Sequence, residues 1–319
     1  MNTIIIEGLS FSLPLFIIAI GGIYSEGSGI TNLALEGLLG FGAFFGGLSY
    51  AVLSRTFAGD PTVLIYASLG FAMIGGALLA LLHALMCIKF KANQVISGVV
   101  INMLSVALTA FLANQINASF FGQPSNKFLL EVFPKATIPL LSNIPILGAV
   151  FTDFYTFELI IVAVALFMAY LLYKTPTGMH IRACGDNPHA LAAAGGNVQK
   201  VRFWSVIASG ALAGLGGMCF AYSISTTFSP NIYMGFGYLA IAAYIFGSWK
   251  IGPTFLACIL FGFARSGGYV LVQKLKLPSS YGDLVLTLPY IVTLVLLLFF
   301  SSTNKPPRAL GEVYDQAKR

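Results

Sequence analysis

Residues 62–88 read TVLIYASLGFAMIGGALLALLHALMCI, a stretch without Asp, Glu, Lys or Arg. As a helix it is long enough to cross about 30 Å of hydrocarbon, which takes roughly 20 apolar residues. The rest of the chain has the same character, because 57% of its 319 residues are hydrophobic and only 9% are charged. A soluble domain carries about 25% charged residues. The composition therefore excludes a water-soluble globular protein and predicts an all-α, polytopic membrane protein.

Similar apolar blocks recur along the whole chain, separated by short polar breaks. The first block lacks the basic segment and the cleavage site of a signal peptide, so we interpret it as a retained helix. We expect one transmembrane domain over 1–319 with about nine membrane-spanning helices, within a range of eight to ten. The expected spans are 4–24, 33–53, 62–88, 93–115, 156–173, 202–222, 236–248, 252–272 and 284–301.

The distribution of basic residues predicts the orientation. If the spans alternate and the C-terminus lies inside, eleven Lys and Arg side chains fall in inner loops and five in outer loops, which is the bias that membrane proteins show. We therefore expect the N-terminus outside, a cytoplasmic loop at 174–201, an outer loop at 116–155 and a cytoplasmic tail at 302–319. The charge of +6 is spread between apolar blocks, so no nucleic-acid partner is expected.

Two segments have the pattern of interrupted helices. GITNLALEG at 29–37 precedes the body of the second span, and GFGYLAI at 235–241 is a weak match to its first part. The span 236–248 is about 20 Å long as a helix and too short to cross alone. In the expected topology the two segments run in opposite directions, which is typical of transporters built from inverted repeats. We predict interrupted helices and a weak inverted repeat.

Polar side chains inside the spans are candidates for a solute pathway. Helical spacing places Asn32 and Glu36 on one face, and Gln94 and Asn102 on a second polar stripe. A carboxylate at this depth needs a polar lumen or a partner, so Glu36 either lines the pathway or hydrogen-bonds the backbone of a neighbour. The stripe on 93–115 equally suits interhelical hydrogen bonds. Arg265, the one basic residue inside a span, either snorkels outward or contacts a polar solute at the outer mouth.

The inner loop contains the signals of a short helix. Asn187 is a candidate N-cap, Pro188 suits the first helical position, and Gly195 would end the helix. We interpret this helix as a docking element rather than a connector. Its basic neighbours would pair with acidic groups of a partner, although Arg182 equally fits the inside excess of positive charge. These neighbours are Arg182, Lys200 and Arg202.

Several chemistries have no counterpart in the sequence. It contains no Gly-x-x-x-x-Gly-Lys-Ser/Thr phosphate-binding loop and no hydrolase or metalloprotease motif. The four cysteines have neither metal-ligand spacing nor the pattern of a disulfide framework. We therefore expect no enzyme activity, metal site or cofactor in this chain.

Four ordered motifs together resemble the permease subunits of bacterial ABC importers for nucleosides, simple sugars and related solutes. This group belongs to the branched-chain amino acid and ribose permease superfamily. The resemblance extends from about residue 10 to 315, with Gly27 in place of the usual basic residue and Asp186 in place of the usual glutamate. The motifs lie at 25–37, 182–195, 235–247 and 309–314.

The resemblance implies a subunit of the bacterial plasma membrane that forms half of a passive pathway. A second permease, often a related but different chain, would supply the other half. A cytoplasmic ABC ATPase would hold ATP and Mg, and an extracytoplasmic or lipid-anchored binding protein would deliver the small-molecule solute. The residues that the resemblance assigns to ATPase coupling are Arg182, Gly185, Asp186, Asn187, Pro188, Ala190 and Gly195.

The solute and the mode of energy coupling remain open at the level of sequence. Neutral and acidic groups along a path of low charge suit a nucleoside or a related polar ring solute better than an ion. Riboflavin and simple sugars are alternatives within the same family. A stand-alone, ion-coupled secondary transporter is an alternative of another class, and Glu36 with Asn32 would then be its ion site.

Overall fold

Long apolar helices form the bundle in the computed structural model, which describes residues 2–56, 60–144, 147–231, 235–276, 278, 280–285, 287–300 and 305–315. Seven of the described helices are long and apolar enough to cross a membrane. They are α1 Asn2–Gly27, α2 Leu35–Thr56, α3 Pro61–Ala84 with its extension to Lys89, α4 Gln94–Phe121, α6 Phe157–Lys174, α9 Val198–Phe220 with its extension to Ser225, and α11 Ile251–Lys274.

Two shorter helices complete the set of apolar elements. They are α10 Phe236–Phe246 and α13 Leu288–Phe300. The all-α prediction is confirmed, since each of the nine predicted spans contains a helix. Span 236–248 is a short helix, as predicted. Leu286 and Ser301 of the last predicted span lie outside the described residues.

Short elements connect the long helices on one side of the bundle. The antiparallel pair β1 and β4 places Phe128 opposite Phe228, and the pair β2 and β3 places Lys135 opposite Tyr155. The first pair joins two loops that are far apart in sequence, whereas the second pair lies within the predicted outer loop 116–155. The short elements are β1 Phe128–Leu129, β2 Lys135–Ala136, α5 Pro139–Ser142, the 3₁₀ turn Leu147–Phe151, β3 Phe154–Tyr155, β4 Thr227–Phe228 and α12 Ser280–Val285.

The predicted inner loop 174–201 folds into two helices rather than one. These helices are α7 Pro176–Asp186 and α8 Pro188–Ala193. The prediction of a single short helix was incomplete, because Thr175 and Pro176 repeat the capping pattern of Asn187 and Pro188: the Thr175 side chain accepts a hydrogen bond from the Gly178 N–H.

The core centres on α1, which packs against α9, α11, α10 and α6. Glycines bring the neighbouring helices α3 and α9 together. A Cβ at Gly76 would collide with the carbonyl of Gly210, so only glycine permits this approach. Close packing of this kind gives a rigid central unit that positions the polar segments described below.

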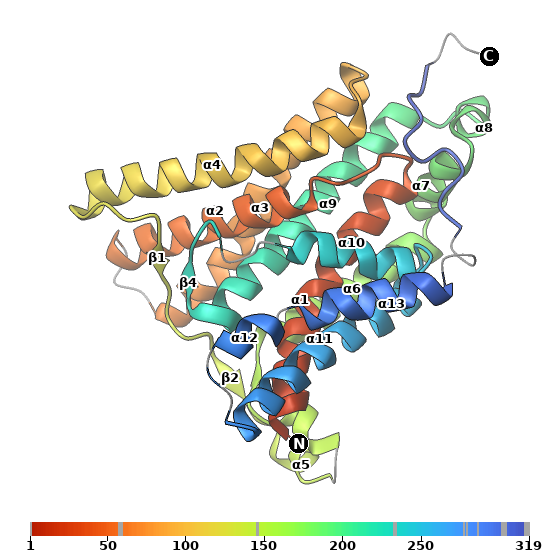
Figure 1. Cartoon of the computed structure of the whole chain (residues 1–319). Helices are drawn as coiled ribbons and strands as arrows, with labels where there is room; N and C mark the ends of the chain where they lie inside the picture. Colours follow the sequence, from red (N-terminus) through yellow and green to blue (C-terminus); the bar gives the residue numbers. More distant parts are fainter. Residues whose placement is uncertain are drawn as a thin grey trace.

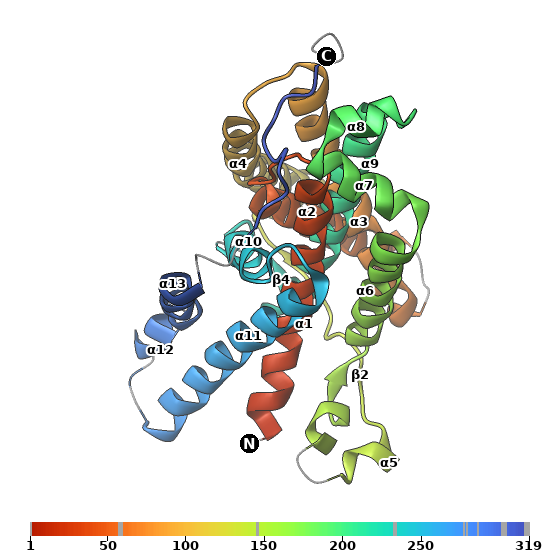
Figure 2. The same ribbon diagram turned by 90° about the vertical axis from the view of Figure 1, so that its right-hand side faces the viewer.

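The two ends of the bundle carry different elements. Figure 1 and Figure 2 show the N-terminus with α5 and β2 at one end, and α7, α8 and the last described residues of the chain at the opposite end. The predicted outer loop therefore shares an end with the N-terminus. The predicted inner loop shares the other end with the tail. Residues 302–304 and 316–319 of the predicted tail lie outside the described residues.

Candidate functional site

The connector 28–34, between α1 and α2, is an irregular segment held by buried polar side chains. Gly29 has a φ of +95°, a left-handed conformation that glycine adopts without strain. Glu26, 4% exposed, accepts hydrogen bonds from the Trp249 indole at 2.7 Å, the Tyr244 hydroxyl at 2.8 Å and the Asn32 backbone N–H at 3.3 Å. This carboxylate ties the connector to α10 and to the turn that follows it.

Glu26 is a residue that the sequence interpretation missed. It lies just beyond the first predicted span, 4–24, and a carboxylate so close to the hydrocarbon boundary was a signal that could have identified it. Its partners Tyr244 and Trp249 are more than 200 residues away along the chain. No local pattern reveals such contacts.

Three of the predicted pathway residues hold the connector and the start of α2. Asn32 donates to the Ser209 hydroxyl at 2.8 Å, and Gln94 accepts from the Thr31 N–H at 2.7 Å. Asn102 accepts from the Gly37 N–H at 2.8 Å and donates to the Leu33 carbonyl at 2.8 Å. The bond from Gly37 to Asn102 joins α2 to α4, and the others join helices to the connector. Gln94 and Asn102 thus make structural hydrogen bonds, which is the alternative given for the stripe on 93–115. A direct role in contacting solute stays a prediction.

Glu36 joins the starts of two helices. It lies in the first turn of α2, and its two carboxylate oxygens accept hydrogen bonds from the N–H groups of Gly235 at 2.5 Å and Gly237 at 2.6 Å at the start of α10. Gly235 has a φ of +99°, close to the +95° of Gly29. Two positive helix ends therefore share one carboxylate. Hydrogen bonding to a neighbouring backbone, one of the two interpretations of Glu36, is thus present in the structure. A role of Glu36 in lining a solute pathway stays a prediction.

Arg265 of α11 also lies near this helix start. Its guanidinium carbon is 4.5 Å from the ring centre of Phe11, 5.2 Å from that of Tyr269 and 5.9 Å from that of Phe236. Its Nε atom is buried and has no hydrogen-bond partner among the described residues. Arg265 and Glu36 thus both contact the first turn of α10, which brings them to one region of the bundle.

The predicted docking helix has the expected local structure. The Asn187 side chain accepts from the Ala190 N–H at 3.0 Å, Pro188 occupies the first turn, and Gly195, just beyond the helix, has a φ of +85°. Ala190 and Asn187 are exposed. The cap and the proline therefore act as the sequence predicted, and α8 presents an exposed face at its end of the bundle.

The remaining candidate coupling residues surround this helix. Gly185 packs against the end of α1, where a Cβ would collide with the carbonyl of Gly27. Asp186 forms an exposed salt bridge with Arg308 at 3.4 Å. Arg182 is exposed and available to a partner. The expectation for Arg202 was wrong: this side chain is 3% exposed and points inward, because backbone carbonyls at two sites bind it.

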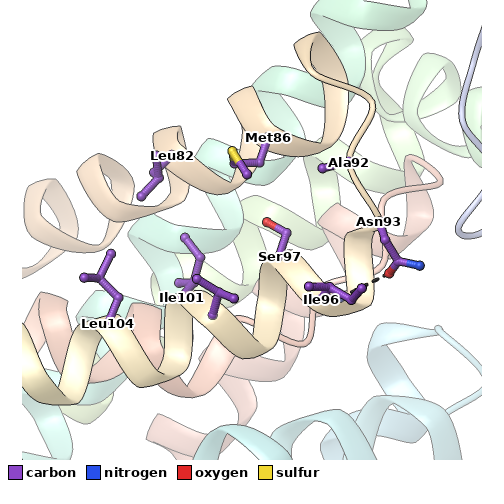
Figure 3. Close-up of a pocket in the computed structure, with 9 residues that line it drawn as sticks. Leu82, Met86, Ala92, Asn93, Ile96, Ser97, Ile101 and Leu104 are labelled. Carbon is purple, nitrogen blue, oxygen red and sulfur yellow. Dashed lines mark hydrogen bonds between the residues drawn. The ribbon is translucent and has the colours of Figure 1, made fainter.

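The face of α4 that points away from Gln94 and Asn102 is apolar. A cavity of about 320 Å³ opens between α3, the linker after it and α4 (Figure 3). Except for Asn93 and Ser97 it is lined by apolar side chains, and Ile96 is 63% exposed. Gln94 and Asn102 lie on the buried face of the same helix. The amphipathic pattern of α4 is thus inverted relative to a soluble helix, as expected where hydrocarbon or another apolar chain replaces water.

Comparison with known proteins agrees with this architecture. The family model described as "Branched-chain amino acid transport system / permease component" matches residues 4–300. No solved structure has significant similarity to the chain. The long apolar helices and interrupted segments define a multi-pass membrane protein of the permease class. The chain belongs to the family of branched-chain amino acid transport system permease components.

Individual relatives cover the whole chain. The guanosine ABC transporter permease protein NupQ of Bacillus subtilis is 37% identical over 100% of this chain and 98% of its own length. The nucleoside ABC transporter permease protein NupC of Lactococcus lactis is 35% identical over the same shares. A second Bacillus subtilis protein, the guanosine ABC transporter permease protein NupP, is 24% identical over 90% of this chain and 77% of its own length.

Proposed function

We propose that this chain is a membrane-spanning permease subunit of an ABC importer for nucleosides. The observation that carries the proposal is the end-to-end similarity, at 37% and 35% identity, to permeases named for guanosine and nucleoside transport. The same relatives count against the stand-alone secondary transporter. They also make nucleosides a better choice than riboflavin or simple sugars.

The solute pathway is proposed to pass the start of α10. Arg265 and Glu36 both contact this turn, and the aromatic rings of Phe236 and Tyr269 lie beside the guanidinium. Aromatic faces and hydrogen-bonding groups are what a nucleobase requires. Asn32, Gln94 and Asn102 would then keep the interrupted segment in place and affect transport indirectly.

Three partners follow from the proposal. A separate cytoplasmic ATPase, carrying ATP and Mg, docks on α8, and the exposed Arg182 is available to an acidic group on it. A second, different permease forms the other half of the pathway, in keeping with the two guanosine permeases of Bacillus subtilis that match this chain at different identities. An extracytoplasmic or lipid-anchored protein delivers the solute. The assembly lies in the plasma membrane of a bacterium, with the C-terminus of this chain inside.

Uptake of labelled solutes tests the substrate. Cells that lack the gene are compared with cells that regain it, using guanosine, uridine, ribose and riboflavin as separate labels. We expect the restored cells to accumulate at least one nucleoside and to leave ribose and riboflavin uptake unchanged. Nucleoside uptake that is identical with and without the chain contradicts the proposal.

Reconstitution tests the source of energy. The chain purified with its ATPase and second permease, and supplied with the solute-binding protein, is compared with the chain alone, both in proteoliposomes. Accumulation by the full complex should require ATP, whereas the chain alone should accumulate nothing under a proton or sodium gradient. Gradient-driven accumulation by the chain alone would establish the secondary transporter instead.

A further inference from the structure

The C-terminal segment 308–315 runs across the end of the bundle that carries α7 and α8 (Figure 1). Its backbone hydrogen-bonds two separate elements. The Ala309 N–H donates to the Gly185 carbonyl of α7 at 2.8 Å, and the Gly311 N–H donates to the Gly29 carbonyl of the connector at 3.0 Å. The segment, which we name the C-terminal strap, thus links the connector directly to α7.

Arg202 is the buried fixing point of the strap. Its Nη1 donates to the Glu312 carbonyl at 2.7 Å, and its Nε donates to the Ser28 carbonyl at 3.2 Å. One guanidinium therefore binds the strap and the connector at the same time, from its position in the first turns of α9. The Arg202 side chain is only 3% exposed, so these charge-assisted bonds are shielded from water. Charge-assisted hydrogen bonds are among the strong ones in proteins.

The far end of the strap packs on α8. The ring of Tyr314 lies 5.3 Å, centre to centre, from that of His189, and Tyr314 also packs on a small apolar cluster beneath the helix, formed by Cys184, Leu191 and Val198. An ion pair between Asp315 and Lys91, 3.3 Å apart, adds the linker before α4. Val313, the neighbour of Tyr314, is 48% exposed.

We propose that the C-terminal strap transmits movement of α8 to the connector 28–34. The connector and α8 are separate elements, yet one short segment hydrogen-bonds the first and packs on the second. A displacement of α8 by a docked partner would pull on the backbone bond that holds Gly29, in the connector that leads into α2 and its Glu36. The proposal rests on the proposed function, since it takes α8 as the helix that the ATPase moves.

The test perturbs one end of the strap and measures the other. Tyr314→Ala is introduced into the full importer in lipid nanodiscs, and amide hydrogen exchange is followed in 28–34 and in α8. We expect exchange in both segments to become at least tenfold faster, and nucleoside uptake to fall several-fold while the ATPase still co-purifies. Tyr314→Phe keeps the ring and should restore both readouts. Val313→Ala, at the exposed neighbouring position, is the matched control and should behave as wild type.

A second variant perturbs the strap from its other end. Gly311 has a φ of +79°, which a β-branched residue adopts only with strain, and it is exposed. Gly311→Val should therefore loosen the bond to Gly29 without unfolding the bundle, and exchange in α8 should rise although Tyr314 is unchanged. This variant also serves if Tyr314→Ala fails to assemble.

The outcomes separate the strap from the proposed function. Faster exchange in α8 with unchanged exchange in 28–34, or wild-type uptake in the variants that loosen the strap, overturns the proposal. The exchange measurement needs neither nucleoside nor ATP, so it reports on the strap even if the wild-type importer carries a different solute. Absence of nucleoside uptake by the wild type contradicts only the proposed function.

Discussion

At the scale of single residues, carboxylates replace water as partners of the irregular backbone. Glu26 and Glu36 accept hydrogen bonds from the backbone N–H groups of Asn32, Gly235 and Gly237, and Glu26 also accepts from two aromatic side chains. An interrupted helix inside a membrane leaves backbone groups that lipid cannot satisfy. These two side chains are therefore integral to the fold, whatever else they contact.

Substitution of Glu36 distinguishes its two interpretations. Glu36→Ala leaves the N–H groups of Gly235 and Gly237 without their acceptors, and each lost partner costs about 1–3 kcal/mol. We expect a fall of roughly 5 °C or more in the unfolding temperature, measured in nanodiscs. Glu312→Ala is the control, because its exposed side chain is not used by the strap. An unchanged unfolding temperature with a raised KM for uptake would favour direct contact with solute instead.

Gly185 offers a second test at this scale. A Cβ there would meet the carbonyl of Gly27, so Gly185→Ala should push α7 away from the end of α1 and reduce uptake several-fold. Gly70→Ala is the matched control, since nothing lies within 4 Å of a Cβ at that helical position. Wild-type uptake and stability in Gly185→Ala would show that this close approach is dispensable.

At the scale of elements, local signals predicted the helices well. The apolar blocks predicted the long helices, and the pattern of Asn187, Pro188 and Gly195 predicted α8. Both predictions succeed because hydrophobic patterning and capping depend on residues close in sequence. The same reasoning overlooked α7, whose Thr175 and Pro176 start signal is equally local. Local signals could not predict the strap or the contacts of Glu26, because these contacts join backbone and side chains from distant parts of the chain.

The helix α8 is expected to transmit force only while it is intact. Ala193→Pro removes a backbone N–H and introduces a ring that clashes with the preceding turn, at a cost of about 3 kcal/mol. We expect the variant to insert normally but to lose ATPase stimulation by the solute-loaded binding protein, measured as phosphate release. Ala193→Ser keeps the N–H and should remain coupled. Full stimulation in Ala193→Pro would rule out α8 as the coupling element.

At the scale of the whole molecule, the two ends of the bundle are chemically distinct, which makes the orientation measurable. All four cysteines are buried, and burial also raises the pKa of the Cys184 thiol, so the native chain should react slowly with a charged maleimide. Single cysteines at the exposed positions Leu140 and Lys200 then mark opposite ends.

The proposed orientation predicts which end reacts in intact cells. Leu140→Cys should be labelled by the impermeant reagent from outside, and Lys200→Cys only in inside-out vesicles. Unmodified chain is the control for background reaction of the native thiols. Labelling of Lys200→Cys in intact cells would place α8 on the wrong side for a cytoplasmic ATPase and contradict the proposed coupling.

The bond between Glu36 and α10 has a mechanical consequence. The carboxylate belongs to the first turn of α2 and is hydrogen-bonded to the backbone at the start of α10. A rotation of α2 about its own axis is therefore expected to displace the start of α10 as well. In the proposed pathway, the starts of α2 and α10 are therefore expected to be displaced together rather than one at a time.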